Sequence, residues 1–189
     1  MVQQDVKDPQ ISASRRALLR RLILGIPATA CLSFLPRMAR ASEERSLSLY
    51  HTHTGERLSV VYYADGRYLS DSLSQLNFLL RDFRNDEMRE IDLNLLDLLH
   101  DVSRRFGGSR TVEIISAYRS PETNAMLHRR SNGVARNSLH MQGKAMDVRI
   151  RGVDLSQFQK AALVLGRGGV GYYSRSNFIH LDTGRTRRW

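Results

Sequence analysis

The chain has 189 residues, 41% of them hydrophobic and 25% charged, with 4 prolines and 1 cysteine. This length fits one domain with a short appendage, and the composition excludes a collagen, a low-complexity chain and a protein with many membrane spans. A single cysteine can form neither an internal disulfide nor a cysteine-rich zinc site. The net charge of +10 favours an anionic partner, so the position of that charge along the chain matters.

The first 41 residues carry half of the net charge, because seven basic side chains stand against two acidic ones. The basic cluster precedes an apolar run over 22–35, which contains Pro27 and is too short to cross a bilayer comfortably. Ala39-Arg40-Ala41 follows, with small residues where a signal peptidase needs them. This order predicts a cleaved signal peptide over 1–41 and a domain over 42–189 with no stable membrane span. A basic amphipathic segment or an uncleaved anchor is the alternative.

The pair Arg15-Arg16, followed by leucines and a weakly hydrophobic run, resembles a twin-arginine signal. This bacterial route exports proteins that have already folded, so we expect the twin-arginine translocation machinery as a partner and a periplasmic location. Cys31 follows Ala28-Thr29-Ala30, which is only a loose lipobox, so lipidation is the less favoured reading.

Strands and helices follow each other in mixed order along residues 42–189. Alternating apolar residues predict a hairpin over 47–62, and apolar residues at helical spacing predict helices over 71–83 and 92–106. Next we expect a strand over 112–117, a helix from Pro121 to about Arg129, a loop over 131–138, a strand over 145–150, a helix over 155–165 and a strand over 178–181. The order predicts an α+β fold with a small antiparallel sheet.

His140, Asp147 and His180 are the candidate metal ligands. Imidazole and carboxylate groups bind catalytic Zn²⁺, which takes three protein ligands and keeps one position for water. The spacing from His140 to Asp147 is too long for one helical face, but suits a loop that turns at Gly143 and returns as a strand. His180 would come from a neighbouring strand. Spacing alone is weak evidence, because such histidines are often surface or core residues.

The surrounding sequence adds specificity to this set. The pattern Ser138-x-His140-x-x-Gly143-x-Ala145-x-Asp147, with Ser-Ala-Tyr-Arg-Ser-Pro at 116–121 before it and Phe-Ile-His at 178–180 after it, resembles the LAS zinc peptidases. These include lysostaphin-type enzymes, D-Ala-D-Ala metallopeptidases and the hedgehog N-terminal domain. The resemblance is closer to the YcbK-like murein endopeptidases, which use the twin-arginine route. It covers 42–189 and the signal, and it implies the expected fold, with the zinc ligands on the sheet.

The resemblance also implies a role for each matching residue. His140, Asp147 and His180 match the zinc ligands, and Arg119 matches the arginine that holds the scissile carbonyl and its oxyanion. A fixed guanidinium at that place stabilises charge that appears only in the transition state. The alternative for Arg119 is a helix cap or a salt bridge. Ser138 either hydrogen-bonds the substrate or caps its own loop.

The sequence departs from the family pattern at the positions that supply the general base. The positions that supply it in better-known members hold Asn177 and Phe178, and neither side chain can take a proton from the attacking water. Asp182 shares a strand face with His180, so it is either the base or a carboxylate that orients a ligand imidazole. His128 is a further candidate for the base.

Four other residues attract attention with less support. His51 and His53 lie in the predicted hairpin, where a turn or surface role is favoured over metal binding. Tyr172 and Tyr173 follow a glycine-rich turn, and either line a peptide groove or pack at the sheet edge.

The resemblance predicts zinc-dependent hydrolysis of cross-links between peptidoglycan stem peptides during cell-wall remodelling. It leaves open whether the bond is D-Ala–diaminopimelate or diaminopimelate–diaminopimelate. The alternatives are a D,D- or L,D-carboxypeptidase and a noncatalytic, zinc-stabilised wall-binding module. Nucleic-acid binding through the arginines at 129, 130, 185, 187 and 188 fits poorly with an export signal and a metal triad. The sequence indicates no oligomeric state.

Overall fold

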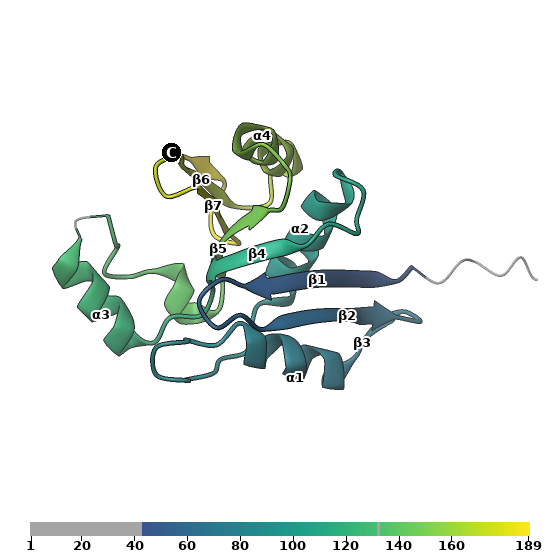
Figure 1. Ribbon diagram of the computed structural model, residues 1–189, viewed down its shortest axis with the longest axis horizontal. Helices are drawn as coiled ribbons and strands as arrows, with labels where there is room; N and C mark the ends of the chain where they lie inside the picture. The colour runs from purple at the N-terminus through teal and green to yellow at the C-terminus, as the bar shows by residue number, and fades with distance from the viewer. Residues whose placement is uncertain (1–42, 132) are drawn as a thin grey trace, which may run out of the picture. The chain divides into compact units, whose positions relative to one another are not determined.

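The computed structural model describes residues 43–131 and 133–189 (Figure 1). The predicted signal peptide, residues 1–41, lies outside the described residues. The strands are β1 (Arg45–His51), β2 (Arg57–Ala64), β3 (Arg67–Tyr68), β4 (Val112–Ser116), β5 (Ala145–Ile150), β6 (Gly169–Tyr173), β7 (Phe178–Asp182) and β8 (Arg187–Arg188). The α-helices are α1 (Ser70–Leu79), α2 (Leu93–Arg104), α3 (Pro121–Arg130) and α4 (Leu155–Leu165), and a short 3-10 helix spans Leu139–Gln142.

The described strands form one open sheet in the order β3-β2-β1-β4-β5-β7-β6-β8. The pairs that carry the candidate ligands, β4 with β5, β5 with β7 and β7 with β6, are antiparallel. β1 and β4 are parallel, because the chain passes through α1 and α2 before it returns to the sheet, and β6 and β8 are also parallel. The α+β prediction is confirmed, although the sheet has eight strands and these two parallel pairs.

Helices cover one face of this sheet. α1 packs against β2, α2 against β1 and α4, and α4 against β5, β6 and β7. The core beneath them takes Met146 and Val148 from β5 and Ile179 and Leu181 from β7, all of them fully buried. Side chains alternate between the two faces of a strand. The residues between these core positions therefore point to the opposite face, where Asp147 of β5 and His180 of β7 lie.

Local hydrogen bonds explain where one predicted helix ends. The helix predicted over 71–83 ends at Leu79, because the chain turns so that the buried Asp82 accepts backbone N–H bonds from Arg84 (3.2 Å) and Ser120 (2.9 Å). The predicted hairpin is confirmed as β1 and β2. Within the described residues, none of the helices combines the length and apolar character needed to cross a membrane.

Candidate metal centre

His140 reaches the site from a tight, capped turn. Ser138 begins the short 3-10 helix, and its hydroxyl accepts a hydrogen bond from the His140 N–H (3.3 Å). Gly143 ends the helix in the left-handed conformation with φ of 67°, and the chain then enters β5. The turn at Gly143 and the return as a strand are as the sequence predicts.

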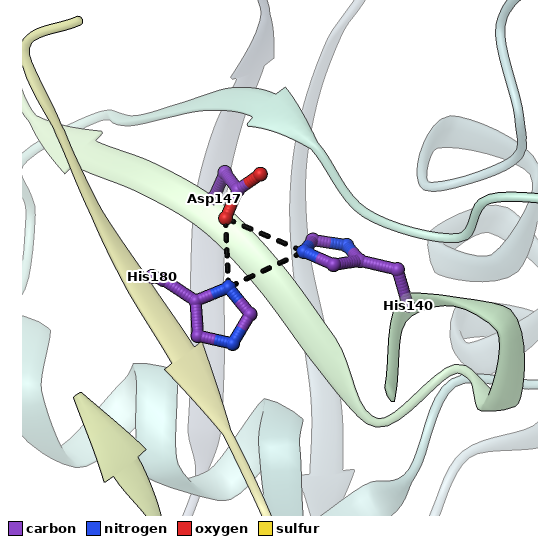
Figure 2. Close-up of side chains that lie close together, drawn as sticks. All are labelled: His140, Asp147 and His180. Carbon is purple, nitrogen blue, oxygen red and sulfur yellow. Dashed lines mark hydrogen bonds and ion pairs between the residues drawn. The ribbon is translucent and has the colours of Figure 1, made fainter. Parts of the chain in front are cut away.

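Asp147 and His180 meet across a pair of antiparallel strands. They are directly opposite each other in the register of β5 and β7, on the face away from the core. The His180 Nδ1 atom is 2.9 Å from Asp147 Oδ1, and His140 Nε2 is 3.3 Å from each of those two atoms. Figure 2 shows the three side chains converging from three segments of the chain. In the described residues they are the one group that could hold a metal ion.

The outer hydrogen bonds of the two imidazoles decide which nitrogens face the centre. His140 Nδ1–H donates to the Ala117 carbonyl (2.7 Å), and His180 Nε2–H donates to Asp182 Oδ2 (3.1 Å). In the neutral form of each ring these bonds hold the proton on the outer nitrogen, so His140 Nε2 and His180 Nδ1 are the atoms that would face a metal ion. Two imidazole nitrogens and a carboxylate oxygen that face one point fit a zinc ion. Metal-binding histidines usually donate their other N–H to a carbonyl or a carboxylate, as His140 and His180 do here.

The electrostatics favour the cation-binding forms of Asp147 and His140, but not of His180. Burial alone would raise the pKa of Asp147, but the charge and hydrogen bonds of His140 and His180 outweigh it and hold that pKa well below its usual range. Burial lowers the pKa of His140, which favours its neutral form. The pKa of His180 is raised despite burial by its hydrogen bonds to Asp147 and Asp182. Near neutral pH the centre therefore holds a carboxylate and a neutral His140.

Arg119 lies behind Asp147. It is 7% exposed, and its Nη2–H groups donate to Asp147 Oδ2 (3.3 Å) and to Ser116 Oγ (3.2 Å). Its Nε–H is buried and has no hydrogen-bond partner among the described residues. The helix cap at the start of α3 comes instead from Ser120, whose hydroxyl accepts from the Thr123 N–H (3.1 Å). The structure thus places Arg119 in a salt bridge with a ligand and leaves one of its donors free.

Asp182 is fully buried on the far side of the His180 ring. It accepts hydrogen bonds from Arg187 Nη1 (3.1 Å) and Nη2 (2.8 Å) and from the N–H groups of Gly169 (3.1 Å) and Gly184 (2.8 Å). Burial would raise the pKa of Asp182, but the bonds from His180 and Arg187 lower it far below its usual value. This carboxylate is surrounded by donors and faces Nε2, the ring nitrogen that points away from the centre.

The other candidate residues lie outside the ligand set. His128, on α3, donates from Nδ1 to the Val134 carbonyl (2.6 Å). His51 is buried, and its Nδ1 accepts hydrogen bonds from the backbone N–H groups of His53 and Thr54 (3.3 Å each). It therefore holds the turn between β1 and β2, which agrees with the turn reading rather than a metal role.

A cavity of about 410 Å³ opens over the three ligands. Arg119 and Ser138 lie on its wall, as do Tyr173, Phe178 and Trp189, whereas Tyr172 does not. Ser138 therefore both caps its own loop and borders the cavity. Asp147 is the one carboxylate among the described residues that line it. The sequence assigns no role to Trp189, although the C-terminal Arg188-Trp189 pair is part of the resemblance to the murein endopeptidases.

The fold and the site together define a class of protein. One cavity is bordered by two histidines whose inner nitrogens face the same point, by a carboxylate between them and by a buried guanidinium next to that carboxylate. These groups are the parts of a metal-dependent hydrolase.

Comparison with known proteins identifies the family within this class. The chain belongs to the family described as peptidoglycan L,D-endopeptidase MepK, whose model matches residues 39–189. It is 42% identical over 183 residues to the peptidoglycan L,D-endopeptidase MepK of Escherichia coli strain K12, covering 95% of this chain and 99% of that relative. It is 40% identical over 163 residues to the probable peptidoglycan L,D-endopeptidase MepK of Haemophilus influenzae, covering 84% and 88%. No solved structure matches the chain significantly.

The family resemblance read from the sequence is thereby confirmed, and with it the prediction of a metallopeptidase enzyme of the murein endopeptidase type.

Proposed function

We propose that the protein is an exported, zinc-dependent endopeptidase that hydrolyses peptide cross-links of peptidoglycan. The observation that carries the proposal is the orientation of the two imidazoles. His140 and His180 are each held by their outer nitrogen, so that both inner nitrogens and Asp147 Oδ1 face one point beside the cavity. The outer bonds fix the orientation of both rings before the ion binds, and His180, whose pKa is raised, gives up any proton on Nδ1 on binding.

The names of the relatives indicate which cross-link is hydrolysed. They are called L,D-endopeptidases, and of the two cross-links that the sequence leaves open, diaminopimelate–diaminopimelate is the one with an L,D bond. We therefore assign that cross-link as the substrate. A carboxypeptidase of the same family and a noncatalytic wall-binding module are the alternatives that the experiment below separates.

His140, Asp147 and His180 would hold the zinc ion, which supplies a Lewis acid that polarises the scissile carbonyl and makes water more acidic. Arg119, on the cavity wall beside Asp147, stabilises the oxyanion with its fixed guanidinium charge. Ser138 lies at the cavity wall, where its hydroxyl hydrogen-bonds the substrate backbone.

Asp182 is assigned as a positioning residue rather than as the proton acceptor. Its oxygens are taken by His180, Arg187 and two backbone N–H groups, and it is fully buried. It keeps the proton of His180 on Nε2 and so keeps Nδ1 available for the metal.

Residues 1–41 are proposed as a twin-arginine signal peptide that takes the folded domain, residues 42–189, to the periplasm. A reporter fused to residues 1–41 should be exported, and replacing Arg15 and Arg16 together by lysine should keep it in the cytoplasm. Export that is unchanged by this replacement would contradict the twin-arginine assignment.

The enzymatic proposal is tested with purified protein and isolated sacculi, with zinc or with a chelator. We expect loss of diaminopimelate–diaminopimelate dimers from the muropeptide profile with zinc only. His140→Ala should lose bound zinc and activity together, while His53→Ala, a histidine outside the ligand set, should keep both. Release of terminal D-Ala without loss of dimers would select the carboxypeptidase, and zinc and sacculus binding without any product would select the noncatalytic module.

A further inference from the structure

Trp189 lies beside His180, a candidate metal ligand. Its indole centroid is 5.3 Å from the centroid of the His180 ring, and it forms part of the wall of the cavity over the ligands. The residue is 47% exposed. An exposed tryptophan is uncommon on a protein surface without a partner, and tryptophan is enriched at binding sites because it offers a large, rigid contact surface.

The backbone and the indole of Trp189 are both fixed. Its N–H donates to the Val170 carbonyl (3.3 Å), and its carbonyl accepts from the Tyr172 N–H (2.9 Å), which extends the pairing of β8 with β6. The indole Nε1–H donates to the Tyr173 hydroxyl (2.9 Å), and the Arg187 guanidinium lies 4.7 Å from the ring centroid. The side chain is therefore ordered before any ligand arrives, which reduces the entropy lost on binding.

Gly171 makes room for this indole on β6. A Cβ atom at Gly171 would lie 2.7 to 2.8 Å from the Cε2, Cζ2 and Nε1 atoms of Trp189. Gly171 is opposite His180 in the register of β6 and β7. The missing side chain thus lets the indole lie directly on the strand next to the metal ligand.

We propose that Trp189 is a substrate-binding and specificity-determining residue, on which the aliphatic part of a stem-peptide residue next to the scissile bond packs. This inference rests on the proposed function. Trp189, Tyr173 and Phe178 form an aromatic wall, while Arg119 and Ser138 supply polar groups to the same cavity. A peptide whose backbone faces the polar groups would place the methylene chain of diaminopimelate against the aromatic wall.

The test uses Trp189→Ala, Trp189→Phe and Gly171→Ala in the full chain. The matched control is Tyr172→Ala, since Tyr172 is also an exposed aromatic residue next to Gly171 but does not line the cavity. The probe is a purified diaminopimelate–diaminopimelate muropeptide dimer. We expect Trp189→Ala to raise KM, and to raise the calorimetric Kd of the zinc-free protein for the dimer, by roughly tenfold each. Trp189→Phe should recover part of the loss, and Tyr172→Ala should resemble the unmodified protein.

Gly171→Ala tests the same contact from the strand. It should weaken dimer binding because the indole must move, and the double variant with Trp189→Ala should bind no more weakly than Trp189→Ala alone. Zinc content and melting temperature should stay close to those of the unmodified protein in Trp189→Ala, which separates substrate binding from a structural role. Trp189 is the sole tryptophan of the chain, so its emission should shift when the dimer is added.

Unchanged KM and Kd in Trp189→Ala would overturn the inference, as would loss of zinc in that variant. If the unmodified protein cleaves no dimer with zinc, the proposed function fails, and the calorimetric and emission measurements still decide whether Trp189 binds the peptide. Absence of both cleavage and binding would overturn both.

Discussion

Asp182 Oδ2 accepts a hydrogen bond from His180 Nε2 at 3.1 Å, and this contact determines which nitrogen of the ring faces the candidate metal centre. His180 and Asp182 lie two positions apart on the same strand, β7, so a residue close in sequence holds the imidazole. Arg187 holds Asp182 in turn through two hydrogen bonds. The orientation of a candidate metal ligand is thus fixed by Asp182 and Arg187, the second of which lies on β8.

Replacing Asp182 by asparagine should weaken zinc binding by about 10 to 100-fold, because the amide cannot hold the His180 proton as a carboxylate does. The measurement is competition for zinc with a chelator of known affinity. Asp154→Asn is the control: Asp154 caps α4, and asparagine caps a helix equally well. Normal zinc affinity together with lost activity in Asp182→Asn would instead identify Asp182 as the general base.

Replacing Arg119 by alanine should lower kcat by about a hundredfold or more, because the oxyanion loses a fixed donor. Zinc should remain bound, since none of the three ligands is removed. Arg149→Ala is the control, because Arg149 is on the same strand and face as Asp147 but pairs with Glu113 (2.6 Å). The readouts are steady-state kinetics on the muropeptide dimer and metal content. If Arg119→Ala turned over the dimer at the normal rate, the role of Arg119 would be limited to its salt bridge with Asp147.

The candidate ligand set is predicted from the family resemblance, and two local features of the sequence agree with it. The turn at Gly143 joins His140 to β5, and strand alternation places Asp147 away from the apolar residues on either side of it. The turn and the alternation are properties of short segments, and short segments leave a visible pattern in a sequence. The register that sets Asp147 opposite His180 is not local, because two neighbouring strands can pair in more than one register.

The supporting residues could not be predicted in this way. Arg119 contacts Asp147 from 28 positions away, and the Trp189 indole lies against Gly171 of β6. Neither contact leaves a periodic signal, because each depends on how whole strands are arranged. The sequence does not settle the role of Asp182 for a similar reason. A strand pattern shows that two side chains share a face, but not which nitrogen of the His180 ring the Asp182 carboxylate contacts.

Replacing Gly143 by alanine should destabilise the domain by about 2 to 4 kcal/mol. A Cβ at this position would lie 2.3 Å from the Glu90 carbonyl oxygen, in addition to the strain of φ at 67°. Gly166→Ala is the matched control, because its φ is 63° but nothing lies within 4 Å of the added Cβ. That variant should lose only about 1 kcal/mol. Chemical denaturation measures both, and equal losses would show that the contact with Glu90 has no effect.

The stability of the domain should fall between about pH 6.5 and pH 4 because of His51. Burial, followed by the charge of His53, lowers the pKa of His51 from 6.5 to about 4. The unfolded chain therefore binds a proton at a higher pH than the folded chain, so the stabilisation is complete above pH 6.5 and is lost as the pH falls toward 4. The largest loss from this group is about 3 kcal/mol.

Urea denaturation at pH 7 and at pH 4.5 measures this effect. His51→Gln should be less stable than the unmodified protein at pH 7, because the buried ring also accepts the backbone N–H groups of His53 and Thr54. Its stability should nevertheless fall less between the two pH values, since the amide does not titrate. His53→Gln, in the exposed neighbour, should keep most of the pH dependence. If His51→Gln retained the full loss at pH 4.5, the acid sensitivity would belong to other groups, and the buried imidazole would serve the turn alone.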